Sequence, residues 1–391
     1  MDDRVLTING GSSSLKFALF RTAPSLARVL SGVFERIGRG DAQLTTVDAA
    51  SGARKQRGVA VADHAACVPI LLDVVGQSTS AVRAIGHRVV HGGTRHRAPG
   101  LVNGRLLADL RALAPFAPEH ELAEIALMEA FARHYPNVVQ VACFDTAFHA
   151  DLPRVAQLLP VPRRYAERGV RRYGFHGLSY TYLMEALERD AGAAAAHGRV
   201  VLAHLGNGAS MAAVRDGRCI DTTMAFTPAA GLVMGTRSGD LDPGLIAYLA
   251  RVEGMTPEQF DAMVNRESGL LGLSETSADV RDLLGRETRD ERAAEALAVF
   301  CQQAKKWIGA LTAALGGLDT LVFAGGIGEH AAAVRARICD GLGHLGIEID
   351  PARNAADAAV ISSDASRATV RVIPTDEEIL IARAADALTK T

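Results

Sequence analysis

Three short segments combine glycine with small polar residues, a composition that suits phosphate binding. They are residues 9–16 (NGGSSSLK), 204–210 (HLGNGAS) and 325–330 (GGIGEH). Glycine lets backbone N–H groups approach an anion closely, and Lys16 adds a positive charge to the first segment. Each segment alone also fits an ordinary turn. The pattern G-x-x-x-x-G-K-[ST] does not occur, and the third segment does not complete G-x-G-x-x-G. Three such loops in one chain favour a binding site in which several of them hold one nucleotide.

Four ionisable side chains could bind or stabilise a phosphoryl group. Arg88 ends an apolar run, and Arg237 stands among glycines in GTRSGD. Arginine binds carboxylate and phosphate groups with two parallel hydrogen bonds. Asp145 follows an apolar strand, where α/β sheets place catalytic groups, and His176 lies in a glycine-flanked turn. A surface ion pair for either arginine and a core position for the histidine remain open alternatives.

Apolar periodicity places these segments on alternating strands and helices, which predicts an α/β architecture. Strands are expected at 5–8, 15–20, 138–143, 200–205, 210–214, 218–222 and 321–324. Helices are expected at 106–113, 122–134, 180–190, 291–315, 331–342 and 377–388, the last packing back on the first domain. Residues 43–58 fit a hairpin or surface loop, and residues 191–196 a helix end or linker. Each half opens with strand, glycine-rich turn and strand, which suggests a duplication.

Length and composition exclude several classes of protein. A chain of 391 residues favours two domains, and a net charge of -2 gives no basic face for nucleic acid. No uncharged apolar run of about 18 residues occurs, so no membrane span is expected. The acidic start is not that of a signal peptide. Five scattered cysteines without Cys-x-x-Cys spacing indicate neither a disulfide framework nor zinc, which favours the cytoplasm.

Taken together, the segments resemble acetate kinase, in family order and along the whole chain. The matching stretches are 9–16, 86–93, 144–149, 172–180, 204–210, 221–244, 326–329 and 375–383. The resemblance implies an actin-like, sugar-kinase-like fold with a duplicated ribonuclease H-like unit and ATP in the cleft between two domains. Residues 1–147 plus 379–391 would form the N-terminal domain, and residues 148–378 the C-terminal nucleotide-binding domain.

The resemblance also implies a reaction, cofactors and partners. The reaction is the reversible, in-line phosphorylation of acetate by ATP to give acetyl phosphate, with propionate or another short-chain carboxylate as the alternative acceptor. The metal is Mg²⁺, or Mn²⁺ in its place. The expected assembly is a cytoplasmic homodimer without nucleic-acid or membrane partners.

Roles carry over from the family residue by residue. Catalysis is assigned to Asp145, His176 and Arg237. Binding of the acid is assigned to Arg88, Val90, His120, Phe175 and Pro228. Nucleotide binding is assigned to Ser12, Ser14, Lys16, His204, Leu205, Gly206, Asn207, Gly208, Asp279, Val280, Arg281, Gly326, Ile327, Gly328, Glu329 and His330. Metal binding is assigned to Asn9 and Glu377. Because a carboxylate nucleophile is already ionised, Asp145 is expected to position groups and organise the metal rather than remove a proton.

The chain departs from the family pattern in several places. His330 replaces an asparagine and Val280 a phenylalanine, and the usual Ala-Pro-Leu-His-Asn-Pro reads APEHEL at 117–122. Glu119 thus stands where leucine forms the fourth wall of the acyl pocket. A buried charge is costly, so Glu119 is expected to turn outward and leave room for propionate, or else to favour a polar acid.

Two other classes of protein remain as alternatives. His120, Glu121 and Glu124 lie within one helical turn or so, as the ligands of a metallohydrolase would, but H-E-x-x-H is absent. An ATP-switched, chaperone-like binding module on the same fold would have no reason to carry Arg88, His176 and Arg237 together, and it would make no acyl phosphate.

Overall fold

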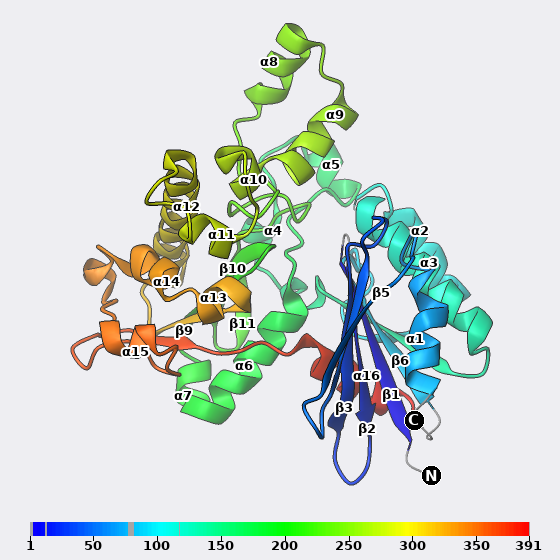
Figure 1. Ribbon diagram of the computed structural model, residues 1–391. Coiled ribbons are helices and arrows are strands. Elements are labelled where there is room, and N and C mark those ends of the chain that lie inside the picture. The colour runs from blue at the N-terminus through cyan, green and yellow to red at the C-terminus, as the bar shows by residue number, and fades with distance from the viewer. Residues whose placement is uncertain (1–2, 12–13, 77–81, 117, 391) are drawn as a thin grey trace. The chain divides into compact units, whose positions relative to one another are not determined.

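The computed structural model describes residues 3–11, 14–76, 82–116 and 118–390, and the side chains of all of these except 118–120. The chain divides into two compact units, each with its own sheet (Figure 1). Unit 1 consists of residues 1–148 and 376–391, and unit 2 of residues 149–375. The C-terminal part of unit 1 begins at Asp376, whereas the resemblance to the family implied residue 379.

Unit 1 has a sheet of eight strands in the order β5-β4-β3-β2-β1-β6-β8-β7. The strand β1 pairs with β2 antiparallel and with β6 parallel, and β6 pairs with β8 parallel. The elements are β1 (Arg4–Gly10), β2 (Ser14–Arg21), β3 (Ala27–Glu35), β4 (Gln43–Asp48), β5 (Arg54–Gly58), α1 (Cys67–Gly76), β6 (Val82–Val89), β7 (Gly100–Leu101), α2 (Gly104–Leu113), α3 (Pro118–His134), β8 (Val139–Phe144) and α16 (Glu377–Leu388). Residues 43–58 form the hairpin that was one of the two expectations for them.

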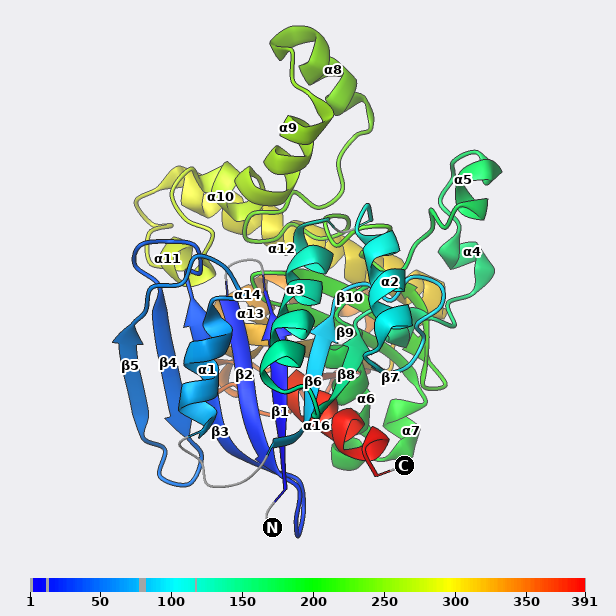
Figure 2. The same cartoon turned by 90° about the vertical axis from the view of Figure 1, so that its right-hand side faces the viewer.

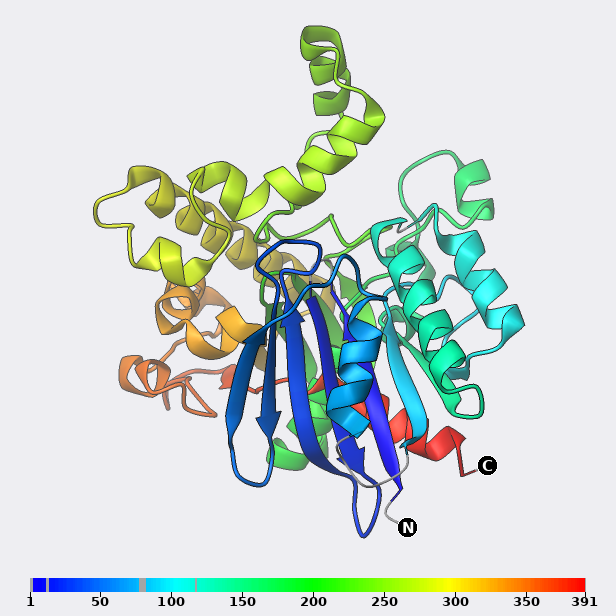
Figure 3. The ribbon, with the colours of Figure 1, turned by 45° about the vertical axis from the view of Figure 1, so that its right-hand side comes forward.

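Helices cover both faces of the unit 1 sheet. On one face, α1 and α3 bury a core that includes Leu6, Ile8, Ile85 and Phe131 (Figure 2 and Figure 3). On the other face, α16 packs against β1, β6 and β8, and a Cβ atom on Gly86 would lie 2.4 Å from Ile381. The predicted return of the last helix to the first unit is confirmed.

Unit 2 has a sheet of five strands in the order β11-β10-β9-β12-β13. Its sheet elements are β9 (Arg199–Leu205), β10 (Ala209–Arg215), β11 (Arg218–Thr222), β12 (Thr320–Ala324) and β13 (Thr369–Val372). Its helices are α4 (Arg154–Gln157), α5 (Arg163–Glu167), α6 (Gly177–Ala191), α7 (Ala193–Ala196), α8 (Gly244–Glu253), α9 (Pro257–Ala262), α10 (Gly269–Ser274), α11 (Val280–Leu284), α12 (Glu291–Leu315), α13 (Gly325–His330), α14 (Ala332–Cys339) and α15 (Pro351–Ala355). Short 3₁₀ or π turns cover Ala147–His149, Met263–Glu267 and Gly343–Leu345.

Five strands of the unit 1 sheet repeat the topology of the unit 2 sheet, which agrees with the duplication that the sequence suggested. In unit 2, β9 pairs with β10 antiparallel and with β12 parallel, and β12 pairs with β13 parallel. These are the relations of β1 to β2 and β6, and of β6 to β8, in unit 1. The last residue pairs but one of the two hairpins are equivalent in position. Asn9 faces Lys16 in unit 1, and His204 faces Ser210 in unit 2.

Candidate functional site

Three neighbouring parallel strands of unit 1 end with polar side chains on one face of the sheet. Asn9 lies near the end of β1, Arg88 near the end of β6, and Asp145 directly follows β8. Successive side chains on a strand point to opposite faces. Ile8, Val89 and Phe144 belong to the cores on the α1, α2 and α3 face. The three polar side chains therefore lie on the α16 face, at the carboxyl ends of the strands.

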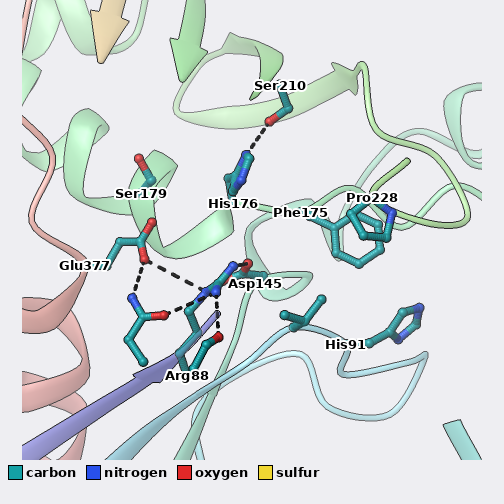
Figure 4. Close-up of polar contacts among 12 residues, drawn as sticks. Arg88, His91, Asp145, Phe175, His176, Ser179, Ser210, Pro228 and Glu377 are labelled. Carbon is teal, nitrogen blue, oxygen red and sulfur yellow. Dashed lines mark hydrogen bonds and ion pairs between the residues drawn. The ribbon is translucent and has the colours of Figure 1, made fainter. Parts of the chain in front are cut away.

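Arg88 is the centre of this unit 1 cluster (Figure 4). Its Nε and Nη2 atoms donate to the two carboxylate oxygens of Asp145, at 3.0 and 2.5 Å. Its Nη1 atom donates to Asn9 Oδ1 at 3.2 Å, and Asn9 Nδ2 donates to Glu377 Oε2 at 3.0 Å. Glu377, the first residue of α16, also lies 3.9 Å from Arg88 Nε.

Burial strengthens the electrostatics of these groups. The side chain of Asp145 is 1% exposed, and those of Glu377 and Arg88 are 14% and 15% exposed. Burial alone would lower the pKa of Arg88, but the charges of Asp145 and Glu377 outweigh burial and raise the pKa above its ordinary value. Arg88 is thus a fixed cation whose direction is set by its carboxylate partners.

The first glycine-rich loop joins β1 to β2 beside this cluster. Lys16 pairs with Asn9 in register, so it lies on the same face, and it is exposed. Ser14 begins β2, whereas Ser12 lies outside the described residues. His64, which sequence reasoning missed, donates its Nε2 hydrogen to the carbonyl oxygens of Gly11 and Ser14, at 2.7 and 3.2 Å.

In unit 2, His176 and Arg237 meet at the second glycine-rich loop. A Cβ atom on Gly208 would lie 2.8 Å from Arg237 Nη2 and 3.4 Å from His176 Nε2. His176 precedes α6 with a left-handed backbone (φ 58°), and its Nδ1 atom shares a hydrogen bond with Ser210 Oγ at 2.8 Å (Figure 4). Arg237 Nη1 donates to the carbonyl oxygen of Pro228 at 2.8 Å. The predicted phosphate loop and both predicted stabilisers therefore lie together.

His204, at the end of β9, lies against the start of α6. Its Nδ1 atom is 2.8 Å from Ser179 Oγ, which is also 2.8 Å from Thr375 Oγ1. The rings of His204 and His176 stack with centroids 4.4 Å apart. Of the remaining loop residues, Leu205 is buried and Asn207 is exposed.

The third glycine-rich segment is helical rather than an open turn. Residues 325–330 form α13, which follows β12 directly, and the helix expected at 331–342 is the shorter α14. The Glu329 carboxylate accepts hydrogen bonds from the N–H groups of Gly325 and Thr375, at 2.8 and 3.2 Å. Gly326 and His330 are exposed, Ile327 is half-buried and Gly328 is buried.

Asp279, Val280 and Arg281, which were predicted to bind the nucleotide, lie at the start of α11. Asp279 accepts a hydrogen bond from the Arg281 N–H group and pairs with the Arg281 guanidinium at 2.6 Å. Val280 is 3% exposed, so its side chain packs inside unit 2, whereas the Arg281 side chain is 87% exposed. Only the two charged residues of this segment are accessible.

The residues predicted for the acyl pocket are divided between the two units. Val90, in unit 1, is 3% exposed and directly follows the strand that carries Arg88. Phe175 and Pro228 lie in unit 2, where Phe175 is 1% exposed. The side chains of Glu119 and His120 lie outside the described residues.

The two glutamates of the alternative metal-binding motif make other contacts in the structure. Glu121 and Glu124 accept hydrogen bonds from backbone N–H groups of the segment after β6. No group of three or more His, Cys, Asp or Glu side chains that could hold a metal is found in the described part of the chain. Within that part, no helix is both long enough and apolar enough to cross a membrane.

Two sheets with a shared strand order, an arginine–aspartate pair in unit 1 and one glycine-rich loop beside His176 and Arg237 in unit 2 suit an ATP-dependent phosphotransferase. Comparison with known proteins makes the assignment specific. The family model described as "Acetokinase family" matches residues 4–383, and the chain belongs to this family. The family predicted from the sequence is confirmed.

Proteins named acetate kinase and propionate kinase are both similar to this chain along nearly its full length. An acetate kinase from Methylocella silvestris is 44% identical over 393 residues, covering 97% of this chain and 96% of the relative. A propionate kinase from Citrobacter rodentium is 42% identical over 390 residues, covering 98% and 96%. The solved structure of a propionate kinase from Francisella tularensis has a TM-score of 0.92 and 34% identity, covering 98% and 99%, so the predicted fold class is confirmed.

Proposed function

We propose that the chain transfers the terminal phosphoryl group of ATP to acetate, reversibly, to form acetyl phosphate and ADP. Membership of the Acetokinase family supports the reaction class. The observation that carries the proposal is Arg88, a partly buried cation held by Asp145 and Glu377 at the carboxyl ends of three parallel strands. Such a cation suits the carboxylate of a small acid.

In this proposal Asp145 orients groups rather than acting as a base. Acetate is ionised at neutral pH and attacks as an anion, so no proton has to be removed. Both oxygens of Asp145 accept hydrogen bonds from Arg88, which fixes the guanidinium relative to the sheet. Arg88 would bind the substrate carboxylate, with Val90, Phe175, Pro228 and His120 around the acyl group.

The proposed work of unit 2 is to bind nucleotide and stabilise the transferring phosphoryl group. Charge spreads over the phosphoryl oxygens in the transition state, and preorganised donors stabilise it. Arg237 and His176 both lie beside Gly208, and His176 is oriented by Ser210. We assign nucleotide binding in unit 2 to His204–Gly208, Asp279–Arg281 and Gly326–His330, and in unit 1 to Ser12, Ser14 and Lys16.

The chemistry of the unit 1 cluster fits Mg²⁺. Asn9, Asp145 and Glu377 offer oxygen donors, two of them carboxylates, and Mg²⁺ is usually held by one or two carboxylates together with water and phosphate oxygens. We propose that Asn9 and Glu377 hold this ion, or Mn²⁺ in its place. When bound, the metal would neutralise part of the phosphate charge.

Propionate is the second candidate substrate. It is favoured by the full-length similarity to a protein named propionate kinase, whose identity of 42% is close to the 43% of a protein named acetate kinase. A hydroxamate assay with ATP and Mg²⁺ tests both candidates, because hydroxylamine traps acyl phosphates. We expect product with acetate and propionate, and little with longer acids. No trapped product from any short-chain acid would refute the proposed function.

We also propose that the protein is a cytoplasmic homodimer. The helix α8 has no buried residue, and its apolar side chains Ile246, Tyr248 and Val252 are 37%, 53% and 61% exposed. In Figure 1, α8 and α9 project from the rest of unit 2. Such an apolar surface suits burial against a second copy. The five cysteines are buried free thiols, which fits a reducing compartment. Light scattering of wild type and Tyr248→Glu would test the dimer.

A further inference from the structure

The segment that follows Arg88 is held in place by side chains. Each of its four consecutive N–H groups, at residues 90–93, donates to a side-chain acceptor. Val90 N–H is shared by the two carboxylate oxygens of Glu124, at 3.2 and 3.1 Å, and His91 N–H donates to Glu121 Oε1 at 3.0 Å. Gly92 N–H donates to Thr146 Oγ1 at 3.0 Å, and Gly93 N–H to His91 Nδ1 at 2.9 Å.

Two of these acceptors come from one face of α3. Glu121 and Glu124 are three residues apart, so they are neighbours on the helix surface. They are 0% and 4% exposed, and Glu121 Oε2 has no hydrogen-bond partner among the described residues. Buried carboxyl groups are costly, so their place here needs a reason beyond packing. The two backbone hydrogen bonds beside Arg88 supply one.

The electrostatics of the pair fit an anionic substrate nearby. Burial, and then the neighbouring Glu124 carboxylate, raise the pKa of Glu121. Burial also raises the pKa of Glu124, although the charge of Arg88 opposes this. A protonated carboxyl group still accepts an N–H hydrogen bond through its carbonyl oxygen, and it adds no negative charge that would repel the acid.

We propose that Glu121 and Glu124 are positioning residues for the carboxylic acid substrate. They fix the backbone of Val90 and His91, and through it the acyl-pocket side chain of Val90 and the end of the strand that carries Arg88. This inference rests on the proposed function, because it takes Arg88 and Val90 as the acid site. It also gives a role to Glu121, one of the positions where the chain departs from the family pattern.

Matched substitutions separate the hydrogen-bond acceptor from the charge. Glu124→Leu and Glu121→Met remove the acceptor, whereas Glu124→Gln and Glu121→Gln keep an acceptor oxygen and cannot ionise. We expect Leu and Met to raise the KM for the acid roughly two- to tenfold, the equivalent of one lost backbone hydrogen bond. The KM for ATP should stay at the wild-type value, and the Gln variants should recover the wild-type KM for the acid.

Hydrogen–deuterium exchange gives a readout that does not depend on activity. The Val90 and His91 amides should exchange faster in Glu124→Leu and Glu121→Met, and at the wild-type rate in the Gln variants. Unchanged exchange and unchanged KM for the acid in the Leu and Met variants would overturn the inference, as would an equal rise in KM for ATP. Wild-type protein that makes no acyl phosphate would refute the proposed function instead, while the exchange result would still decide whether the two glutamates hold this segment.

Discussion

Arg335 joins three parts of unit 2 from a completely buried position, so its removal should have a large and calculable effect. Its side chain is 0% exposed. The Nη1 atom donates to the carbonyl oxygens of Gly328 and Glu329 in α13, at 2.9 and 3.0 Å. The Nε and Nη2 atoms donate to Asn354 Oδ1 and Asn354 O, at 2.8 and 2.7 Å, and Nη2 also pairs with Asp357.

Arg335→Met keeps most of the buried volume but removes every donor. Breaking a buried ion pair on one side typically costs about 3–5 kcal/mol, because the remaining partners are left unpaired. The Asp357 side chain is 39% exposed and can be hydrated, so we expect the lower end, about 3 kcal/mol. A domain of the size of unit 2 loses about 2–4 °C in Tm for each kcal/mol, which gives a fall of about 6–12 °C.

Differential scanning calorimetry measures this fall, and steady-state kinetics tests its functional consequence. Because Arg335 fixes the carbonyl groups of α13, its loss should raise the KM for ATP and leave the KM for the acid unchanged. Arg335→Lys, which keeps the charge but not the planar fork of donors, should fall between Met and wild type. A Tm within roughly 2 °C of wild type, the size of effect that a surface substitution has, would refute the reasoning.

Five further substitutions test the roles assigned to other residues. Asp145→Asn should lower kcat by orders of magnitude with a smaller change in ATP affinity, and near-normal turnover of the folded variant would remove Asp145 from catalysis. Arg88→Ala should raise the KM for the acid as well as slow turnover, whereas Arg237→Ala should mainly lower kcat, because the charge that Arg237 meets develops during transfer; identical profiles in initial-rate kinetics would contradict this division. Gly208→Ala should lower kcat while circular dichroism stays unchanged, because the new Cβ atom would meet the mobile ends of side chains, 2.8 Å from Arg237 Nη2; full activity would show that this approach is not needed. Burial raises the pKa of Glu121 above 4.5, so the folded chain keeps a proton that the unfolded chain loses, and this group's contribution to stability falls as the pH rises from about 4.5 towards the raised pKa. The Tm of Glu121→Gln minus that of wild type should therefore be larger at pH 8 than at pH 5. An equal difference at the two pH values would contradict the raised pKa.

Periodic segments of the chain could be predicted with little error. The helices 291–315 and 377–388 have the predicted bounds. Each has an apolar stripe and begins after an aspartate that caps its N-terminus, and the first of them ends at the C-cap residue Gly316. The strands β1 and β2 are also where alternation predicted them. By contrast, residues 325–330 were expected to form a turn and are helical, since a glycine-rich sequence carries almost no periodic signal.

The supporting contacts of the site could not be predicted from local sequence. Glu121 and Glu124 bind N–H groups 30 and 34 residues away, and Thr146 binds one 54 residues away. Ser179 joins two residues that lie 25 and 196 positions from it. Such pairs depend on strand order and helix placement, and no spacing rule within the sequence reports them.

In the proposed reaction, an oxygen of the substrate carboxylate attacks the terminal phosphorus of ATP. The most direct test is ³¹P NMR of wild-type protein with ATP, Mg²⁺ and acetate labelled with ¹⁸O in both carboxyl oxygens. We expect an acyl phosphate signal with the isotope shift of a single bridging ¹⁸O, together with ADP. Formation of ADP and inorganic phosphate alone, or an acyl phosphate without the isotope shift, would contradict it.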